Sequence, residues 1–173
     1  RLLPKWGSIF VNLGDTYHKK CLAGVPARFE VAAQDAGWIV RNRIIWAKRA
    51  GMTEPARNRL ASSYEYIFHV AASHDYYYDT FGYSEKFGNG STPGDVWEIG
   101  LRRDVSRHLA PFPTELVERI VTLACPERVC LACGTPQRRL VETTRELDSN
   151  RPQARRALEL ARLHGLTDEH LAA

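Results

Sequence analysis

Two groups of residues in this 173-residue chain have types and spacings that could do chemistry. The larger is residues 38–59, "WIVRNRIIWAKRAGMTEPARNR", a basic segment in which six Lys and Arg side chains stand against the single acid Glu54. Lys and Arg gathered in this way bind polyanions such as nucleic acids, whose phosphates supply affinity and position but no sequence information. A solvated basic loop is the alternative, and charge alone favours it because surface Lys and Arg are common.

The second group is the pair Cys130 and Cys133, which Gly134 follows. Two thiolates spaced in this way on a tight turn form half of a structural zinc site, which needs four ligands. The completing pair is expected beyond residue 173, because Cys125 ends an apolar helical pattern and is expected in the core. The alternative, which the residues alone leave open, is a pair of reduced cysteines without a metal.

The overall composition indicates one ordinary domain. A hydrophobic share of 44% is enough for one core, and the net charge of +4 permits an anionic partner without requiring one. No run of about 18 apolar residues and no basic-then-apolar leader occur, so we expect neither a membrane span nor a secretion signal. The cysteines do not form a secreted disulfide framework, so a cytoplasmic location is expected. The chain starts without Met and ends within a helical pattern, which predicts an internal piece of a longer protein.

Apolar patterns predict the elements that position these groups. We predict strands at 7–15, 38–48 and 63–73, helices at 25–36 and 111–125, a short extended piece at 94–100 and a loop at 79–94. The order strand, helix, strand, strand predicts an α/β fold in which a βαβ unit is followed by an antiparallel hairpin partner at one sheet edge.

Two helical segments follow in the second half of the chain. The helix at 111–125 has Thr114 as its expected cap and Leu116, Ile120 and Leu123 on one face. The basic tail predicts two helices joined at Gly165. That pattern fits a helix-turn-helix, but many ordinary helical hairpins have the same pattern.

Four segments occur in a fixed order: "GSIFVNLGDTY", then "GWIVRNRIIWAKRAGMTEPARNRLASSYEYIFHVAAS", then "GDVWEI", then "HLAPFPTELVERIVTLACPE". The ordered set, which covers residues 1–127, resembles the N4/N6 amino-methyltransferases of DNA, in the circular arrangement whose catalytic half precedes the cofactor half. The resemblance implies part of a Rossmann-like, three-layer methyltransferase sheet. In that sheet 7–13 would be a central parallel strand, and 39–47 with 64–72 an antiparallel edge pair.

The resemblance also implies partners and sites. Ligands of open α/β sheets lie outside the carboxyl ends of the strands, which places Asn12, Gly14 and Asp15 at the mouth of the active site. The basic segment would contact the phosphates of double-stranded DNA through Lys48, Arg49, Arg57 and Arg59. The implied cofactor is S-adenosyl-L-methionine, with His108, Phe112 and Pro113 as the expected pocket lining.

Two motifs of the resembled family are missing from the chain. The catalytic Asp- or Ser-Pro-Pro-aromatic signature is expected upstream of residue 1, and the glycine-rich cofactor strand is expected downstream of the cysteines. No catalytic residue is therefore assigned, and the chain alone is expected to be inactive. Relatives with the Ser-Pro-Pro-Tyr form slightly favour cytosine N4 over adenine N6 as the methylated group.

These expectations divide the chain into three parts. Residues 1–127 form the target-side part of a methyltransferase domain, residues 128–150 a Cys-containing knuckle, and residues 151–173 a truncated basic helical tail. Two alternatives remain at this point: a non-catalytic DNA-binding module with a zinc knuckle, and a degenerate methyltransferase that retains only the fold.

Overall fold

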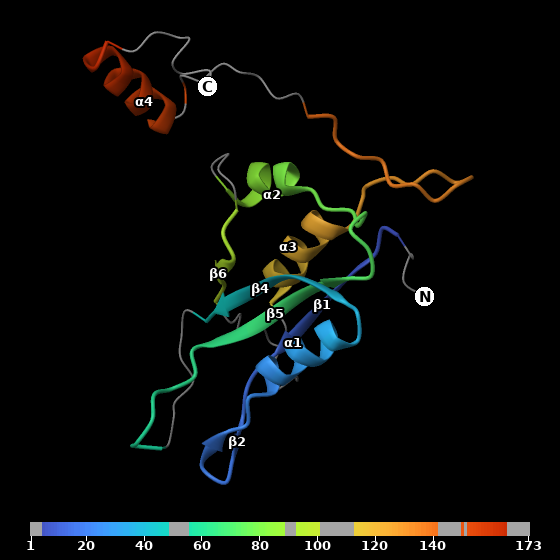
Figure 1. Ribbon diagram of the computed structural model, residues 1–173, viewed down its shortest axis with the longest axis vertical. Coiled ribbons are helices and arrows are strands. Elements are labelled where there is room, and N and C mark those ends of the chain that lie inside the picture. Colours follow the sequence, from blue (N-terminus) through green and yellow to red (C-terminus); the bar gives the residue numbers. More distant parts are fainter. Residues whose placement is uncertain are drawn as a thin grey trace. The chain divides into compact units, whose positions relative to one another are not determined.

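The computed structural model describes residues 5–48, 56–88, 93–100, 113–141, 150 and 152–165. The chain divides into two compact units, Arg1–Arg138 and Arg139–Ala173. Figure 1 shows the elements, which are, in order, β1 (Ser8–Leu13), β2 (Tyr17–His18), β3 (Cys21–Leu22), α1 (Val25–Asp35), β4 (Ile39–Ala47), β5 (Tyr64–Ala71), α2 (Thr80–Phe87), β6 (Val96–Glu98), α3 (Thr114–Ala124) and α4 (Pro152–Leu163). None of the described helices is long and apolar enough to cross a bilayer.

The main sheet has the strand order β1-β5-β4-β6. β5 pairs antiparallel with both β1 and β4, and β4 pairs parallel with β6, so β1, β4 and β6 all run in one direction. The predicted antiparallel pairing of 39–47 with 64–72 is confirmed, as is the mixed α/β class.

The predicted position of 39–47 and 64–72 as the edge pair of the sheet is wrong for the described residues. Within this chain β1 lies at one end of the strand order and pairs antiparallel with β5. Its predicted central place in the whole sheet depends on strands expected outside this chain and stays a prediction. β4 and β5 are inner strands of this sheet rather than its edge pair. The reason is that β5 returns beside β4 and bonds β1 along its other side, which separates the two strands of the βαβ unit.

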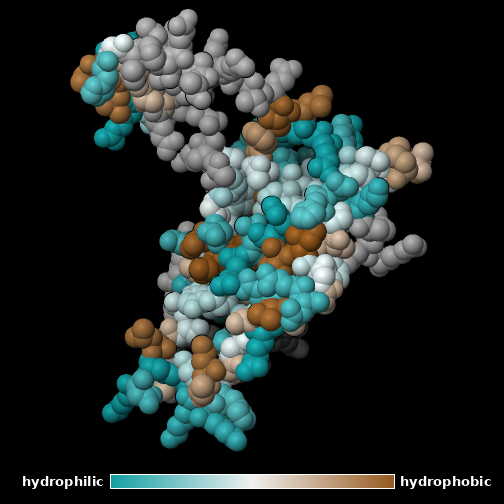
Figure 2. All heavy atoms as spheres, in the orientation of Figure 1, coloured by the Kyte–Doolittle hydropathy of each residue, from teal (hydrophilic) through white to brown (hydrophobic). Residues whose placement is uncertain are grey.

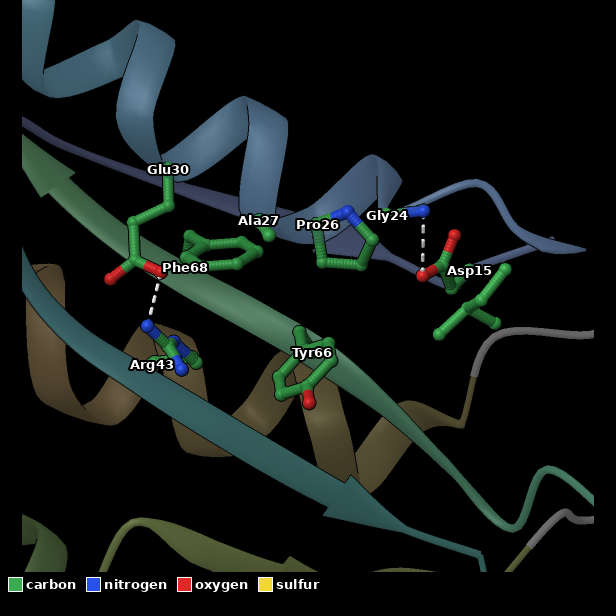
Figure 3. Close-up of a pocket in the computed structure, with 9 residues that line it drawn as sticks. Asp15, Gly24, Pro26, Ala27, Glu30, Arg43, Tyr66 and Phe68 are labelled. Carbon is green, nitrogen blue, oxygen red and sulfur yellow. Dashed lines mark hydrogen bonds and ion pairs between the residues drawn. The ribbon is translucent and has the colours of Figure 1, made fainter.

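β5 is the most deeply buried strand because helices pack on both of its faces. Neighbouring residues of a strand point to opposite faces. On one face, the Phe68 ring contacts Phe29 of α1, with ring centroids 5.2 Å apart. On the other face, Ile67 belongs to a core cluster that includes Leu116 and Leu123 of α3. Helices therefore cover the sheet on both sides, with α1 on one side and α3 on the other (Figure 3).

The structure corrects two expectations about the helices. Residues 80–87, predicted as loop, form α2. Its N-cap is Asp79, whose side chain accepts a hydrogen bond from Gly82 N at 2.9 Å. The Tyr83 ring stacks on Trp97, so tertiary burial overrides the weak helix propensity of this Gly- and Ser-containing segment. Thr114 is the first residue of α3 rather than its cap.

Other helix predictions hold. α3 buries Leu116 and Leu123 and packs Ile120 against the same cluster, as the spacing predicted. α4 ends before Gly165, whose φ of 64° suits glycine, while the second helix predicted for the tail lies outside the described residues.

The strand β5 contains a buried histidine, His69, that is stacked between two aromatic rings. The His69 ring is stacked between Phe10, at a centroid distance of 4.5 Å, and Tyr78, at 5.2 Å. Its Nε2 lies 2.9 Å from the Ser8 hydroxyl, and its buried Nδ1 has no hydrogen-bond partner among the described residues. Burial, with a smaller contribution from the charge of Arg41, lowers the pKa of His69 to about 4. The imidazole is therefore neutral in the folded protein at neutral pH.

We expect this histidine to make the fold acid-sensitive. A histidine titrates near pH 6.5 in an unfolded chain, so acidification protonates the unfolded state before it protonates folded His69, whose pKa is about 4. The free energy of unfolding should fall by about 2 kcal/mol between about pH 7.5 and pH 5 because of this residue. His69→Phe keeps the ring stack and should remove that part of the pH dependence, measured by urea unfolding at both pH values. Equal pH dependence in the two proteins would contradict this assignment.

Candidate functional site

The candidate site lies at the end of the sheet where β1 and β4 finish. Cross-strand register places Leu13 and Ile45 on either side of Tyr66, so the carboxyl ends of the two strands meet at one edge. Beyond that edge follow the β2–β3 hairpin and the described residues of the basic segment that come after β4, which are residues 48 and 56–59. This edge brings together the residues that the sequence placed at an active-site mouth and several of those expected to contact DNA.

A carboxylate that the sequence analysis missed lies at this edge. Glu65 forms an ion pair with Lys48, whose side chain is only 10% exposed and whose ammonium lies 5.1 Å from the centre of the Trp46 ring. A Cβ at Gly14 would lie 3.6 Å from Glu65 Cγ, so the mouth residue Gly14 borders the same carboxylate. The alternation "YEY" on a strand carries no signal for this pair, because the partner, Lys48, is 17 residues away and follows the end of β4.

Asp15 organises the loop between β1 and α1 and is fully engaged in doing so. Its carboxylate accepts hydrogen bonds from Thr16 N at 2.9 Å, from Val25 N at 3.0 Å and from Gly24 N at 3.1 Å. Asn12 likewise donates to the Tyr66 carbonyl, at 3.1 Å. Both predicted mouth residues therefore lie at the expected edge, and both hold the backbone in shape there.

The β2–β3 hairpin projects beyond this edge, with Lys19 and Lys20 as its two turn residues. Their φ angles are 49° and 64°, both in the left-handed region, where hairpin turns normally have Asn and Gly. This conformation costs about 1 kcal/mol for each non-glycine residue. The Arg59 guanidinium lies 3.8 Å from the centre of the Tyr17 ring, which joins the basic segment to the hairpin.

A hollow lies on the α1 face of the sheet (Figure 3), lined by Asp15, Leu22, Gly24, Pro26, Ala27, Glu30, Arg43, Tyr66 and Phe68. Its charged groups all have partners: Asp15 binds backbone N–H groups, and Glu30 forms an ion pair with Arg43. A hydrogen bond with Tyr64 raises the pKa of Tyr66, so this phenol stays protonated. The lining therefore offers no activated acid or base, and the hollow is best explained as a packing feature beneath α1.

The remaining residues predicted to contact DNA or the cofactor have three different outcomes. Arg57 and Arg59 are exposed in the described part of the basic segment, while Arg49, His108 and Phe112 lie outside the described residues. Pro113 is buried immediately before α3, whose first turn has no side-chain cap.

The two predicted metal ligands lie on one tight turn. Gly134 N donates to the Cys130 carbonyl at 2.8 Å, and Gly134 has a φ of 69°, which the bend requires. Hydrogen bonding with Thr135, whose hydroxyl oxygen lies 3.1 Å from Cys133 Sγ, lowers the pKa of the Cys133 thiol. Cys125, expected in the core, is exposed. Among the described residues no group of three or more His, Cys, Asp or Glu could hold a metal, so the zinc site stays a prediction.

Comparison with known proteins decides the family. The model of the DNA methylase family, which groups N6- and N4-type enzymes, matches residues 1–129. The chain belongs to this family. The match ends near the start of the cysteine turn and includes every element from β1 to α3.

Curated relatives of this chain are named as type II methyltransferases. M.SmaI of Serratia marcescens is 35% identical over 157 residues, which cover 72% of this chain and 53% of the relative. M.Cfr9I of Citrobacter freundii is 29% identical over 148 residues, which cover 68% of this chain and 49% of the relative. The chain thus spans about half the length of these relatives.

A solved structure supports the fold. The PvuII DNA methyltransferase, described as cytosine-N4-specific, matches with a TM-score of 0.61 at 16% identity, covering 73% of this chain and 50% of that chain. At this identity the likeness bears on the fold alone. The matched fold includes, in this chain, the sheet in which β5 lies antiparallel between β1 and β4.

We expect the Lys48–Glu65 pair to stabilise the edge of the sheet. Lys48→Met would leave Glu65, 26% exposed, without its partner, and Glu65→Gln would leave the largely buried ammonium uncompensated. A double-mutant cycle followed by urea unfolding should give a coupling free energy of about 1–2 kcal/mol. A coupling near zero would mean that the two side chains do not hold this edge together.

Proposed function

We propose that this chain is the target-side part of an S-adenosyl-L-methionine-dependent methyltransferase that modifies an exocyclic amino group in double-stranded DNA. The observation that carries the proposal is the family match over residues 1–129, combined with the edge where β1 and β4 end beside a basic surface. The relatives are type II methyltransferases of about twice this length, so the activity is proposed for the whole protein that contains this chain.

The basic segment would hold the DNA backbone. Arg57 and Arg59 are exposed at the candidate edge, and phosphate contacts from such side chains position a duplex without reading its sequence. The stack of Arg59 on Tyr17 restricts where its guanidinium can lie, which favours a defined contact. Lys48 is paired with Glu65, so a phosphate contact from Lys48 would require this ion pair to open. Arg49 remains a proposed contact on the resemblance alone.

The start of α3 fits one end of the proposed cofactor. The first turn of α3 has no side-chain cap, and uncapped N–H groups at a helix start bind carboxylates such as that of a methionine group. The acid in this turn, Glu115, is occupied by a hydrogen bond from Arg119 at 2.7 Å. S-adenosyl-L-methionine supplies a methyl group on a positively charged sulfur. Pro113 and the first turn of α3 would border it, with His108 and Phe112 proposed from the resemblance.

The chemistry explains why this part needs no activated nucleophile. An amino group inside a duplex is out of reach for in-line transfer, so the target base must be flipped out of the stack. The rate then depends on holding the amino nitrogen and the methyl group in line. The signature that would orient the amino group is not in this chain, so we propose that residues 1–129 supply DNA binding and one border of the pocket. Cytosine N4 is the proposed target.

The alternative of a DNA-binding module built on a zinc knuckle has less support. The family match lies on residues 1–129 rather than on the cysteine turn and tail. The cysteine turn provides two ligands, and the described residues bring no third ligand to it.

We predict that the whole protein, incubated with duplex DNA and S-adenosyl-L-methionine, transfers methyl groups to cytosine N4. Digestion to nucleosides and mass spectrometry would identify N4-methylcytosine, whereas N6-methyladenine would move the target to adenine. The 173-residue chain alone serves as the control and should transfer none. Failure of the whole protein both to bind S-adenosyl-L-methionine and to methylate any duplex would indicate a degenerate methyltransferase.

A further inference from the structure

The β2–β3 hairpin, residues 17–22, forms a second basic surface beside the candidate edge. Lys19 and Lys20 at its tip are exposed, and no ion pair joins either of them to another residue in the described ranges. Each strand of the hairpin has two residues, so the tip cannot bury an apolar face of its own. Hydrophilic side chains gather in Figure 2 over the end of the molecule where Figure 1 places β2.

Two sets of contacts fix the position of this hairpin. At its base, the Asp15 carboxylate accepts hydrogen bonds from backbone on both sides, and Ala23 N donates to the Thr16 carbonyl at 2.8 Å. On its flank, the Tyr17 ring lies under the Arg59 guanidinium. A two-stranded hairpin of this size is not stable by itself, so these contacts hold its tip in place.

The turn conformation singles out the two lysines. Both residues have positive φ angles, 49° and 64°, in a two-residue turn that Asn and Gly would adopt without strain. Lysine brings no backbone advantage to these positions. What it brings is two compact ammonium charges at the most projecting point of the hairpin.

We propose that the tip of the hairpin, Lys19 and Lys20, binds backbone phosphates of duplex DNA next to the region held by Arg57 and Arg59. This proposal rests on the proposed function, because it assumes a DNA substrate. The Tyr17–Arg59 stack makes the hairpin and the basic segment one continuous cationic surface, along which one DNA strand could be followed. Ammonium groups act as point charges rather than as planar forks, so the contact should be independent of base sequence.

The decisive variant is Lys19→Asn combined with Lys20→Gly in the whole protein. It removes both charges and relieves the strained turn, so the hairpin should remain folded and the melting temperature should be equal or higher. Binding to a fluorescent duplex, measured by anisotropy over a range of NaCl concentrations, should show a salt slope reduced by about 2. Affinity at low salt should fall on the order of tenfold.

Two controls make the result specific. Lys19→Arg combined with Lys20→Arg keeps both charges and should keep the original salt slope. Lys86→Gln removes a lysine of α2 that is paired with Glu118, away from the hairpin, and should leave the slope unchanged.

The outcomes separate this proposal from the function on which it rests. An unchanged salt slope in Lys19→Asn/Lys20→Gly, with wild-type binding intact, overturns the role of the hairpin alone. A loss confined to one DNA sequence overturns the assignment to phosphates. A wild-type protein that binds no duplex overturns the proposed function together with this inference. A slope reduced equally on unrelated sequences supports the phosphate contact.

Discussion

The pairing of β5 with both β1 and β4 is the constraint on which the other features depend. β5 is buried on both faces, by α1 through Phe68 and by α3 through Ile67, so its place between the two strands is fixed by core packing. Because β5 is antiparallel to both neighbours, the carboxyl ends of β1 and β4 lie at the same end of the sheet as the start of β5. That arrangement brings Glu65 to Lys48 and Gly14, although these residues come from three separate stretches of the chain. A one-residue slip in the register of β5 would turn Glu65 to the α1 face and separate this pair.

The charges near this edge divide into those that hold the fold and those that are exposed at the surface. The carboxylate of Asp15 is occupied by backbone N–H groups, and that of Glu65 by an ammonium. Asp15 therefore binds the N–H groups at the start of α1, and Glu65 compensates the charge of Lys48. In the part of the chain that the structure describes, neither carboxylate is paired with the exposed cations on the surface. The positive charges of the hairpin and of the basic segment lie on the surface beside the sheet edge, at Lys19, Lys20, Arg57 and Arg59. A polyanion approaching this edge would therefore meet mainly positive charge, which is the arrangement that electrostatic attraction of DNA requires.

Sequence patterns predicted the elements well where local periodicity and burial agree. α3 has its buried face where Leu116, Ile120 and Leu123 predicted it, and β4 and β5 pair as expected. Sequence patterns failed where long-range packing decides the outcome. α2 was missed because its residues have low helix propensity, and the packing of Tyr83 on Trp97 stabilises the helix instead. The inner places of β4 and β5 were missed because strand order is set by which partners a strand pairs with, which periodicity does not encode. The location of the site at this edge of the sheet was predicted from the resemblance. The Lys48–Glu65 pair could be identified only from the register of β5 against β4.

The described part of this member of the DNA methylase family has exposed basic residues beside the sheet edge, and the hollow next to that edge offers no activated acid, base or nucleophile. Methyl transfer to an amino nitrogen does not need such a group in this part of the protein, because the nitrogen lone pair is the nucleophile and alignment limits the rate. In the proposed reaction, alignment would require rigidity at the edge where the base and the cofactor would meet. The three backbone bonds of Asp15, the bond from Asn12 to the Tyr66 carbonyl and the Lys48–Glu65 pair all add rigidity there. Asn12 and Asp15, which the sequence placed at the mouth of an active site, are thus better explained as supports that keep this edge rigid.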